Sequence, residues 1–437
     1  MRPHRIVAFT LPVAAAASLT GTATATAATA AGASAEPRPV ASWITRNATP
    51  LSTIDPRAPL TDLAPLRRTI GDATIVGLGE STHGASEEAK LKHRVLRLLV
   101  ERMGFRSIAW EEDWTLGLQL NDYILTGKRD PAALLKKGDW QSQEVLDVLH
   151  WLRSFNKAHP HDPVRFFGVE YYATQRSAYD AVTAYTAKNA PDRLAEVKRQ
   201  VEAILPWTAD IGAYVQWLWK DASDADKQRF ATHARALYSL VERLPHRRGY
   251  EVTLHAARQI LSFYEHYDLK DNNAYRDEHT SQNLRWWRSF SHDKVVYWAA
   301  APHSANAPHV RLSAAPGPDI TFAGVGSFMR RWYGERYRSI GFTFDHGSIA
   351  GDPGGPALPA PPPPEGWAEH PLGRVPYAQY AIDLRKPAPP AVTTWLTSPA
   401  TTRGLIWVPS STWTGGSLRQ YYDAIVHRQT ITPQHPL

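Results

Sequence analysis

The stretch GLGESTHGASEEAKLKHR, residues 77–94, places an acid and an imidazole on the turn between an apolar run and a charged segment. The run ATIVGLGE (73–80) predicts a short buried strand that ends at Glu80. The segment 86–105 repeats apolar residues at helical spacing and ends at a glycine, so it predicts an amphipathic helix. Glu80 and His83 are therefore expected at the carboxyl end of a strand.

Further apolar runs alternate with helical segments along the chain. Helices are predicted around 114–125 and 142–157, and residues 174–290 are helical almost throughout. Short apolar strands followed by helices indicate a mainly parallel sheet. We expect an α/β fold with a mainly parallel central sheet flanked by helices and a large helical insertion at about 174–290. The further strands are predicted at 106–113, 163–172, 294–300, 337–344, 379–385 and 403–409.

The amino terminus has the pattern of a secretory signal. Arg2 and Arg5 precede a short apolar region and a small-residue tract that ends in Ala33-Ser34-Ala35. This predicts cleavage after Ala35 and a secreted protein. Residues 36–60 are interpreted as a lead-in segment, and 61–437 as the functional domain. No later run is long enough to span a bilayer, so no stable membrane insertion is expected.

The composition excludes several kinds of functional site. The 437 residues include no Cys, which excludes disulfides, thiolate nucleophiles and thiolate–metal sites. The formal net charge is +7, and it falls to +5 when the signal is removed with Arg2 and Arg5. Because no basic block interleaves with aromatic residues, nucleic acid is not an expected partner.

Four polar residues fall at or just after predicted strand ends. They are Glu80, Glu111, Glu170 and His303. In parallel sheets the ligand lies outside the carboxyl ends of the strands, so these side chains are expected on one rim. A carboxylate beside an imidazole fixes its tautomer and suits a general base acting on water. From spacing alone, a Glu that caps the loop and a surface His explain Glu80 and His83 better than catalysis does.

Other catalytic signatures are absent or weak. No G-x-S-x-G, H-E-x-x-H or G-x-x-x-x-G-K-[ST] motif occurs. Two S-x-x-K matches, at Ser154 and Ser291, lack the companion motifs of serine acyl-enzymes. The pair Glu88 and Lys92 is four residues apart, which is also the spacing of a simple helix ion pair.

At these residues the sequence resembles the erythromycin esterase family. GLGESTHG is similar to that family's G-E-x-T-H-G signature, and AWEEDW, FFGVEYY and AYRDEHTSQNLRWW resemble its later segments. The resemblance covers roughly residues 60–433. It implies an erythromycin esterase-like fold and a cofactor-independent esterase that opens an ester or macrolide-like lactone with water.

The resemblance also implies roles for individual residues. His83 corresponds to the general base, with Glu80, Glu111 and His303 completing the catalytic set. The substrate-binding residues that it implies are Lys92, Glu170, Arg276 and Asp277. Lys92 stands where the family has Arg. The family's W-A-H-N-A-H motif falls on 298–303, where Ala300 replaces its first His and Ala301 its Asn.

The replacement at Ala300 leaves three functions open. The first is a secreted hydrolase of an ester or lactone with a His-activated water. The second is an elimination or cyclisation in secondary metabolism on the same scaffold, and the third is a catalytically weak binding or resistance protein. No metal is expected, because two Glu and two His are better interpreted as an acid–base network and Ala300 removes a potential ligand.

Overall fold

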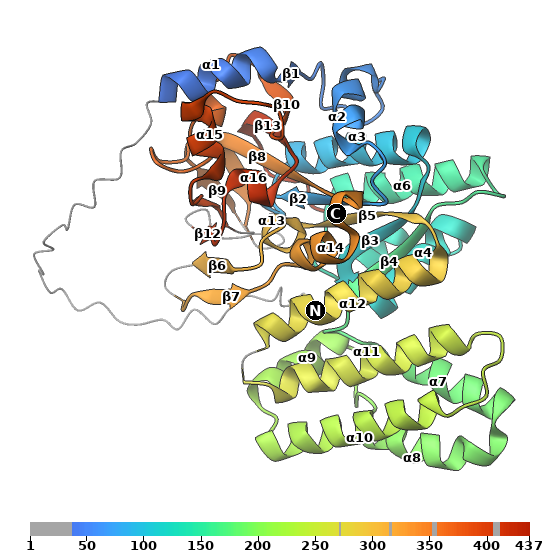
Figure 1. Ribbon diagram of the computed structural model, residues 1–437. Helices are drawn as coiled ribbons and strands as arrows, with labels where there is room; N and C mark the ends of the chain where they lie inside the picture. The colour runs from blue at the N-terminus through green and yellow to red at the C-terminus, as the bar shows by residue number, and fades with distance from the viewer. Residues whose placement is uncertain (1–36, 271, 314–316, 352–355, 405–410) are drawn as a thin grey trace, which may run out of the picture.

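The computed structural model describes residues 37–270, 272–313, 317–351, 356–404 and 411–437 (Figure 1). The predicted signal at 1–35 lies outside these residues. The main sheet has the strand order β1-β10-β13-β8-β2-β5-β3-β4, and β9 pairs with β8. Its strands are β1 (Thr49–Pro50), β2 (Ile75–Glu80), β3 (Phe105–Asp113), β4 (Arg165–Glu170), β5 (Lys294–Ala300), β8 (Tyr337–Ala350), β9 (Ala357–Ala360), β10 (Gln379–Asp383) and β13 (Ala424–Ile431).

The centre of this sheet is parallel. The pairs β13–β8, β8–β2, β2–β5, β5–β3 and β3–β4 are all parallel, whereas β1, β9 and β10 pair antiparallel at its edges. The predicted α/β class with a mainly parallel sheet is therefore confirmed. The carboxyl ends of β2, β3, β4 and β5 meet at one edge, as the sequence predicted.

Helices cover both faces of the sheet, as Figure 1 shows. One face packs on α3 (Ser86–Met103), α4 (Trp114–Thr126) and α6 (Gln143–Ala158), with Val76 and Leu78 of β2 pointing into this layer. The other face packs on α12 (Asn273–Ser291) and α14 (Val325–Tyr333), and Ile75 belongs to that core. Because alternate residues of a strand face opposite sides, β2 is buried on both faces and reads as a continuous apolar run.

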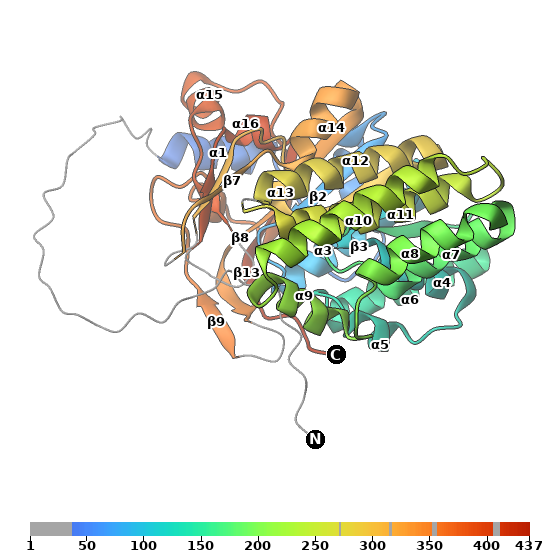
Figure 2. The same cartoon turned by 90° about the horizontal axis from the view of Figure 1, so that it is seen from below.

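The predicted helical insertion forms a separate cluster below the sheet. It consists of α7 (Arg176–Asn189), α8 (Leu194–Ile204), α9 (Ile211–Lys220), α10 (Asp224–Glu242) and α11 (Tyr250–Asp268). These helices share a hydrophobic core of their own, whose buried residues range from Ala178 to Tyr267 along the chain. Figure 2 shows them lying together across the underside. Helix α12 was predicted within the insertion, but Leu284 and Trp287 bury it in the core under the sheet.

Strands β9 and β13 were not predicted, and two further parts of the fold were missed. Residues 36–60, interpreted as a lead-in, contribute α1 (Pro37–Asn47) and β1, and Val40, Trp43 and Ile44 of α1 are buried in a core around β10. A second, four-stranded antiparallel sheet is also present. It contains β6 (Val310–Ser313), β7 (Ile320–Phe322), β11 (Thr402–Arg403) and β12 (Thr412–Thr414). Most of the strand predicted at 403–409 lies outside the described residues.

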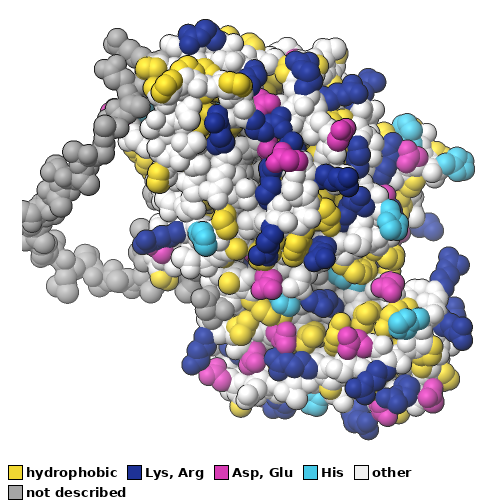
Figure 3. Space-filling model, viewed as in Figure 1, with side chains coloured by type: hydrophobic (Ala, Val, Ile, Leu, Met, Phe, Trp, Pro, Cys, Tyr) yellow, Lys and Arg dark blue, Asp and Glu magenta, His cyan; other side chains and the backbone are white. Residues whose placement is uncertain are grey.

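The surface carries mixed charge on the face shown in Figure 3, where Lys and Arg alternate with Asp and Glu. This pattern agrees with the scattered positive excess of the sequence. Within the described ranges, no helix is both long and apolar enough to cross a membrane.

Candidate active site

Two glycines of β2 bring the first and last parts of the site together. A Cβ on Gly79 would collide with Ser304 and Ala301, and one on Gly77 would collide with Tyr337. Neither glycine has a positive φ, so the backbone conformation does not require glycine at these positions. Their role is close approach: they let the short helix α13 (Ala301–Ser304), which carries His303, pack directly against β2.

Glu80 and His83 form a buried pair at the end of β2. Nδ1 of His83 hydrogen-bonds Oε1 of Glu80 at 2.6 Å, and both side chains are under 10% exposed. The ammonium of Lys92 contacts the other carboxylate oxygen of Glu80. Because the carboxylate accepts from Nδ1, the neutral ring of His83 carries its proton there, and Nε2 is its basic nitrogen.

The residues between Glu80 and His83 are held by Glu88. The backbone N–H groups of Ser81 and Thr82 donate to the two oxygens of its carboxylate at 3.3 and 3.2 Å. The simple Glu88–Lys92 ion pair that the spacing also allowed is not formed, since each side chain is engaged elsewhere. At the start of α3, the N–H of Ser86 donates to the carbonyl of Thr432.

Glu111, at the end of β3, is the centre of the site. Its Oε2 accepts from the backbone N–H of Ala300 at 2.8 Å and lies 4.0 Å from Nε2 of His83. Its Oε1 accepts from Nη2 of Arg276 at 2.9 Å and lies 3.4 Å from Nε2 of His303. One carboxylate therefore faces both imidazoles and a guanidinium.

Arg276 bridges the carboxylates of Glu111 and Glu170. Its Nη2 and Nε donate to Glu170 at 3.0 and 3.3 Å, and Thr280 Oγ1 also donates to Glu170. The Arg276 side chain is 27% exposed, while Glu111 and Glu170 are nearly fully buried. Arg276 is thus the member of the cluster that opens to solvent.

His303 is held from behind by Asp277. Both carboxylate oxygens of Asp277 lie 2.9 Å from Nδ1 of His303, and one accepts from the backbone N–H of Val325. Phe322 stacks on the imidazole. Asp277, Glu170 and Lys92 were predicted to bind substrate. Their buried contacts with His303, Arg276 and Glu80 instead suit positioning roles, and Arg276 alone of the four is open to a substrate.

The surroundings shift the pKa values of the two imidazoles, His83 and His303, in opposite directions. Burial lowers the pKa of His83 to about 4, with help from the positive charges of His303 and Arg276. Burial also acts on His303, but the carboxylates of Asp277 and Glu111 outweigh it and raise its pKa. For Glu111 burial opposes ionisation, yet His303, Arg276 and His83 together lower its pKa to about 2.

Trp140 is a site residue that the sequence analysis missed. Its indole N–H donates to the carbonyl of Glu111 at 2.8 Å, and its ring centroid lies 4.2 Å from that of His83. It follows a short helix in an irregular segment, where no periodic pattern singles out one Trp. Tyr172, whose ring faces Arg276, was also missed as a site residue.

His309, the residue directly before β6, is exposed. Within the described ranges, no group of three His, Asp or Glu side chains is arranged to hold a metal ion. The guanidinium of Arg276 occupies the position between the carboxylates that a cation would need. The expectation of metal-independent chemistry stays a prediction.

The sequence matches the family model described as erythromycin esterase over residues 100–431. The chain belongs to the erythromycin esterase family. The matched range includes Glu111, Arg276 and His303 and begins after the Glu80–His83 segment. Among curated relatives, the chain is 31% identical over 129 residues to erythromycin esterase type II of Escherichia coli, covering 29% of this chain and 30% of that protein.

A second relative, the putative hydrolase YbfO of Bacillus subtilis strain 168, is 24% identical over 264 residues. The match covers 58% of this chain and 57% of that protein. The aligned segments thus span about a third and somewhat over half of these two relatives. Family membership supports a hydrolase acting on a small molecule.

Solved structures match over nearly the whole chain. A crystal structure of a Bacillus cereus protein is similar with a TM-score of 0.79 and 26% identity, covering 92% of this chain and 99% of that one. A succinoglycan biosynthesis protein gives 0.78 at 26% identity, covering 91% and 98%. A mutant of the erythromycin esterase EreC in its open conformation gives 0.67 at 16% identity, covering 89% and 98%, and this match shows the fold alone.

Proposed function

We propose that this protein is a secreted hydrolase that opens an ester or lactone by attack of a water activated by His83. The observation that carries the proposal is that two buried imidazoles face the same carboxylate, Glu111, while their surroundings shift their pKa values in opposite directions. Pairs of titratable groups whose pKa values are shifted apart by their surroundings are characteristic of sites that use one group as a base and the other as an acid.

His83 supplies the base. Glu80 fixes its ring, and the low pKa keeps it neutral near pH 7, so Nε2 can accept a proton. The 4.0 Å between Nε2 and Oε2 of Glu111 is too long for a direct hydrogen bond. A water beside this gap can donate one proton to each atom and keep a lone pair for attack. As the new C–O bond forms, the proton that the water donates to Nε2 moves to His83.

His303 and Arg276 supply positive charge on the opposite side of Glu111. As water adds to the substrate carbonyl, negative charge develops on its oxygen, and a cation beside it lowers the barrier. When the ester C–O bond breaks, the leaving alkoxide takes a proton from His303. The products are a carboxylic acid and an alcohol. The acid returns a proton to His303 as it becomes a carboxylate, and His83 releases the proton of the water to solvent, which restores both rings. Asp277 keeps His303 in its protonated form until that step.

The substitution at Ala300 fits this division of work. The backbone N–H of Ala300 holds Glu111, a function that needs no imidazole. The proton transfers then fall to His83 and His303 alone. A small apolar side chain at this position leaves more space beside the carboxylate, which favours a substrate different from that of relatives with His.

Turnover of a panel of macrolides, simple lactones and esters tests the proposal, with product mass as the readout. Hydrolysis adds one water to the substrate, elimination removes one, and cyclisation leaves the mass unchanged. We expect addition of water by the wild type and by the exposed-residue control His309→Ala, with activity retained after treatment with a chelator. His83→Ala is expected to lose at least ~10²-fold in rate. Equal turnover by His83→Ala and the wild type would refute the assignment.

A further inference from the structure

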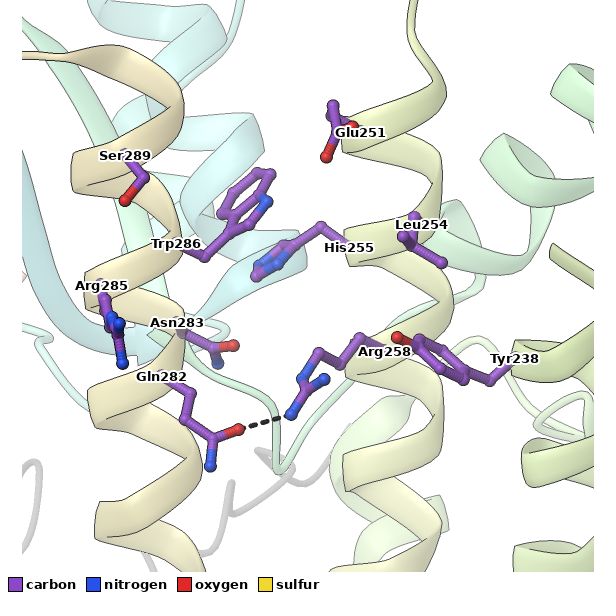
Figure 4. Close-up of a pocket in the computed structure, with 10 residues that line it drawn as sticks. All are labelled: Tyr238, Glu251, Leu254, His255, Arg258, Gln282, Asn283, Arg285, Trp286 and Ser289. Carbon is purple, nitrogen blue, oxygen red and sulfur yellow. Dashed lines mark hydrogen bonds between the residues drawn. The ribbon is translucent and has the colours of Figure 1, made fainter. Parts of the chain in front are cut away.

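A second concave site lies between the insertion and the core, on the part of α12 away from the catalytic cluster. This cavity, of about 370 Å³, lies between α11 and α12 (Figure 4). Arg276 and Trp286 are ten residues apart on α12, which corresponds to about 15 Å along a helix. The cavity is thus distinct from the Glu111-centred site. Its lining residues are Tyr238, Glu251, Leu254, His255, Arg258, Gln282, Asn283, Arg285, Trp286 and Ser289.

Two guanidiniums beside the cavity have no acidic partner among the described residues: that of Arg258 is half-buried, whereas that of Arg285 is exposed and lies over the ring of Trp332. In the described part of the chain, no carboxylate lies within 4.0 Å of Arg258 or Arg285. Arg258 is half-buried and hydrogen-bonds the neutral amide of Gln282, as Figure 4 shows. Removing a cation from water without an anion is costly, so this arrangement favours an external anion.

Beside Arg258, two aromatic rings bridge α11 and α12, as Figure 4 shows. The rings of His255 and Trp286 stack with centroids 3.7 Å apart and an interplanar angle of 8°. Leu254 adds an aliphatic surface beside them. Burial, followed by the charge of Arg258, lowers the pKa of His255 well below its ordinary value, so this surface stays neutral. An apolar surface beside a guanidinium suits a ligand with one charged end and one apolar end.

The charge of the lining sets the charge of the ligand. Arg258 and Arg285 contribute two positive charges and Glu251 one negative charge, which leaves a net of one positive charge. A single carboxylate balances this net charge, whereas a doubly charged phosphate exceeds it. The planar fork of a guanidinium also matches a carboxylate with two parallel hydrogen bonds.

We propose that this cavity binds a small aromatic or flat carboxylate, with its anionic end on Arg258 and Gln282 and its apolar body against Trp286 and Leu254. The volume suits a molecule of modest size, at the lower end of ligand cavities. Bound there, the ligand connects α11 of the insertion with α12 of the core. The proposal does not depend on the reaction at Glu111.

Benzoate is the probe, and calorimetric titration of the whole protein is the measurement. For a ligand this small we expect a Kd of roughly millimolar order. Benzamide, which has the same shape without the charge, should bind at least about tenfold more weakly. Arg258→Gln should weaken benzoate binding by a similar factor, while Arg248→Gln, an exposed control, should not change it.

A second variant protects the test against misfolding of the first. Ser289→Trp fills the mouth of the cavity without removing either guanidinium, and it should also weaken benzoate binding. Arg276→Gln identifies binding at the catalytic cluster. If benzoate binding is lost in Arg276→Gln but unchanged in Arg258→Gln and Ser289→Trp, the proposal is overturned. Equal affinity for benzoate and benzamide overturns the assignment of the ligand class.

Discussion

Glu111→Gln is the substitution that tests the centre of the site most sharply without a known substrate. The amide has the shape of the carboxylate but no charge. In the folded protein the charge faces Arg276 at 2.9 Å and His303 at 3.4 Å. These cations, with His83, hold the pKa of Glu111 at about 2 against an ordinary value of 4.5, although burial acts in the opposite direction.

The size of the effect follows from this difference. A depressed pKa means that ionised Glu111 stabilises the fold above pH 4.5, and that this stability is lost as the pH falls through about 2. The ionised carboxylate therefore contributes on the order of 3 kcal/mol at pH 7 and about 1 kcal/mol at pH 3. Glu111→Gln removes this contribution, so its deficit in unfolding free energy should shrink by about 2 kcal/mol between these pH values.

Urea unfolding of the wild type and of Glu111→Gln at a series of pH values between 7 and 3 measures the deficit directly. Titrating groups away from Glu111 act on both proteins alike, so their contributions largely cancel, and the difference reports Glu111 together with the histidines whose pKa values it shifts. Glu335→Gln, at an exposed ion pair, serves as the control and should show a deficit below ~1 kcal/mol. A deficit for Glu111→Gln that is the same at pH 7 and pH 3 would show that the carboxylate is not held ionised by its neighbours.

Three further outcomes are expected. Because His83 must be neutral to act as base and its pKa is about 4, kcat/KM should fall as the pH drops through about 4, as a pH–rate profile will show; a fall centred near pH 6.5 would contradict this. Asp277→Asn should lower kcat by roughly 10²- to 10⁴-fold with little change in KM. It should also move the alkaline limb of the pH–rate profile to lower pH, because the carboxylate that raises the pKa of His303 is lost. An unchanged profile would remove Asp277 from the mechanism. Trp43→Ala should lower the free energy of unfolding in urea by about 3–5 kcal/mol, because the indole of Trp43 in α1 is 3% exposed and part of the core. A loss below ~1 kcal/mol would mean that α1 is not anchored there.

The sequence predicted the catalytic edge of the sheet because strand ends have a clear local signal. Glu80, Glu111 and Glu170 are each the first polar group at the end of a buried apolar run, and parallel pairing brings such ends together. The predicted helices at 86–105, 114–125 and 142–157 correspond to α3, α4 and α6. Their apolar spacing is regular enough to locate each element within a few residues.

The parts that were missed depend on partners that are distant along the chain. Strand β13 contains His427, Arg428 and Gln429, which interrupt its apolar pattern. His427 is nevertheless fully buried, because its Nδ1 hydrogen-bonds Thr343 Oγ1 of the neighbouring strand. The positions of Lys92 and Asp277 behind Glu80 and His303 likewise follow from packing between elements, which spacing within one element does not reveal.

The central claim is that Glu111 faces one imidazole that stays neutral and one that favours its proton. Nuclear magnetic resonance of ¹⁵N-labelled histidine rings over a pH series measures both states, with His83→Asn and His303→Asn used to assign the signals. The account predicts that His83 keeps a neutral ring down to a pH of about 4, while His303 retains its proton to a higher pH than an ordinary histidine. Two rings that titrate together, or a His83 that is charged at neutral pH, would contradict it.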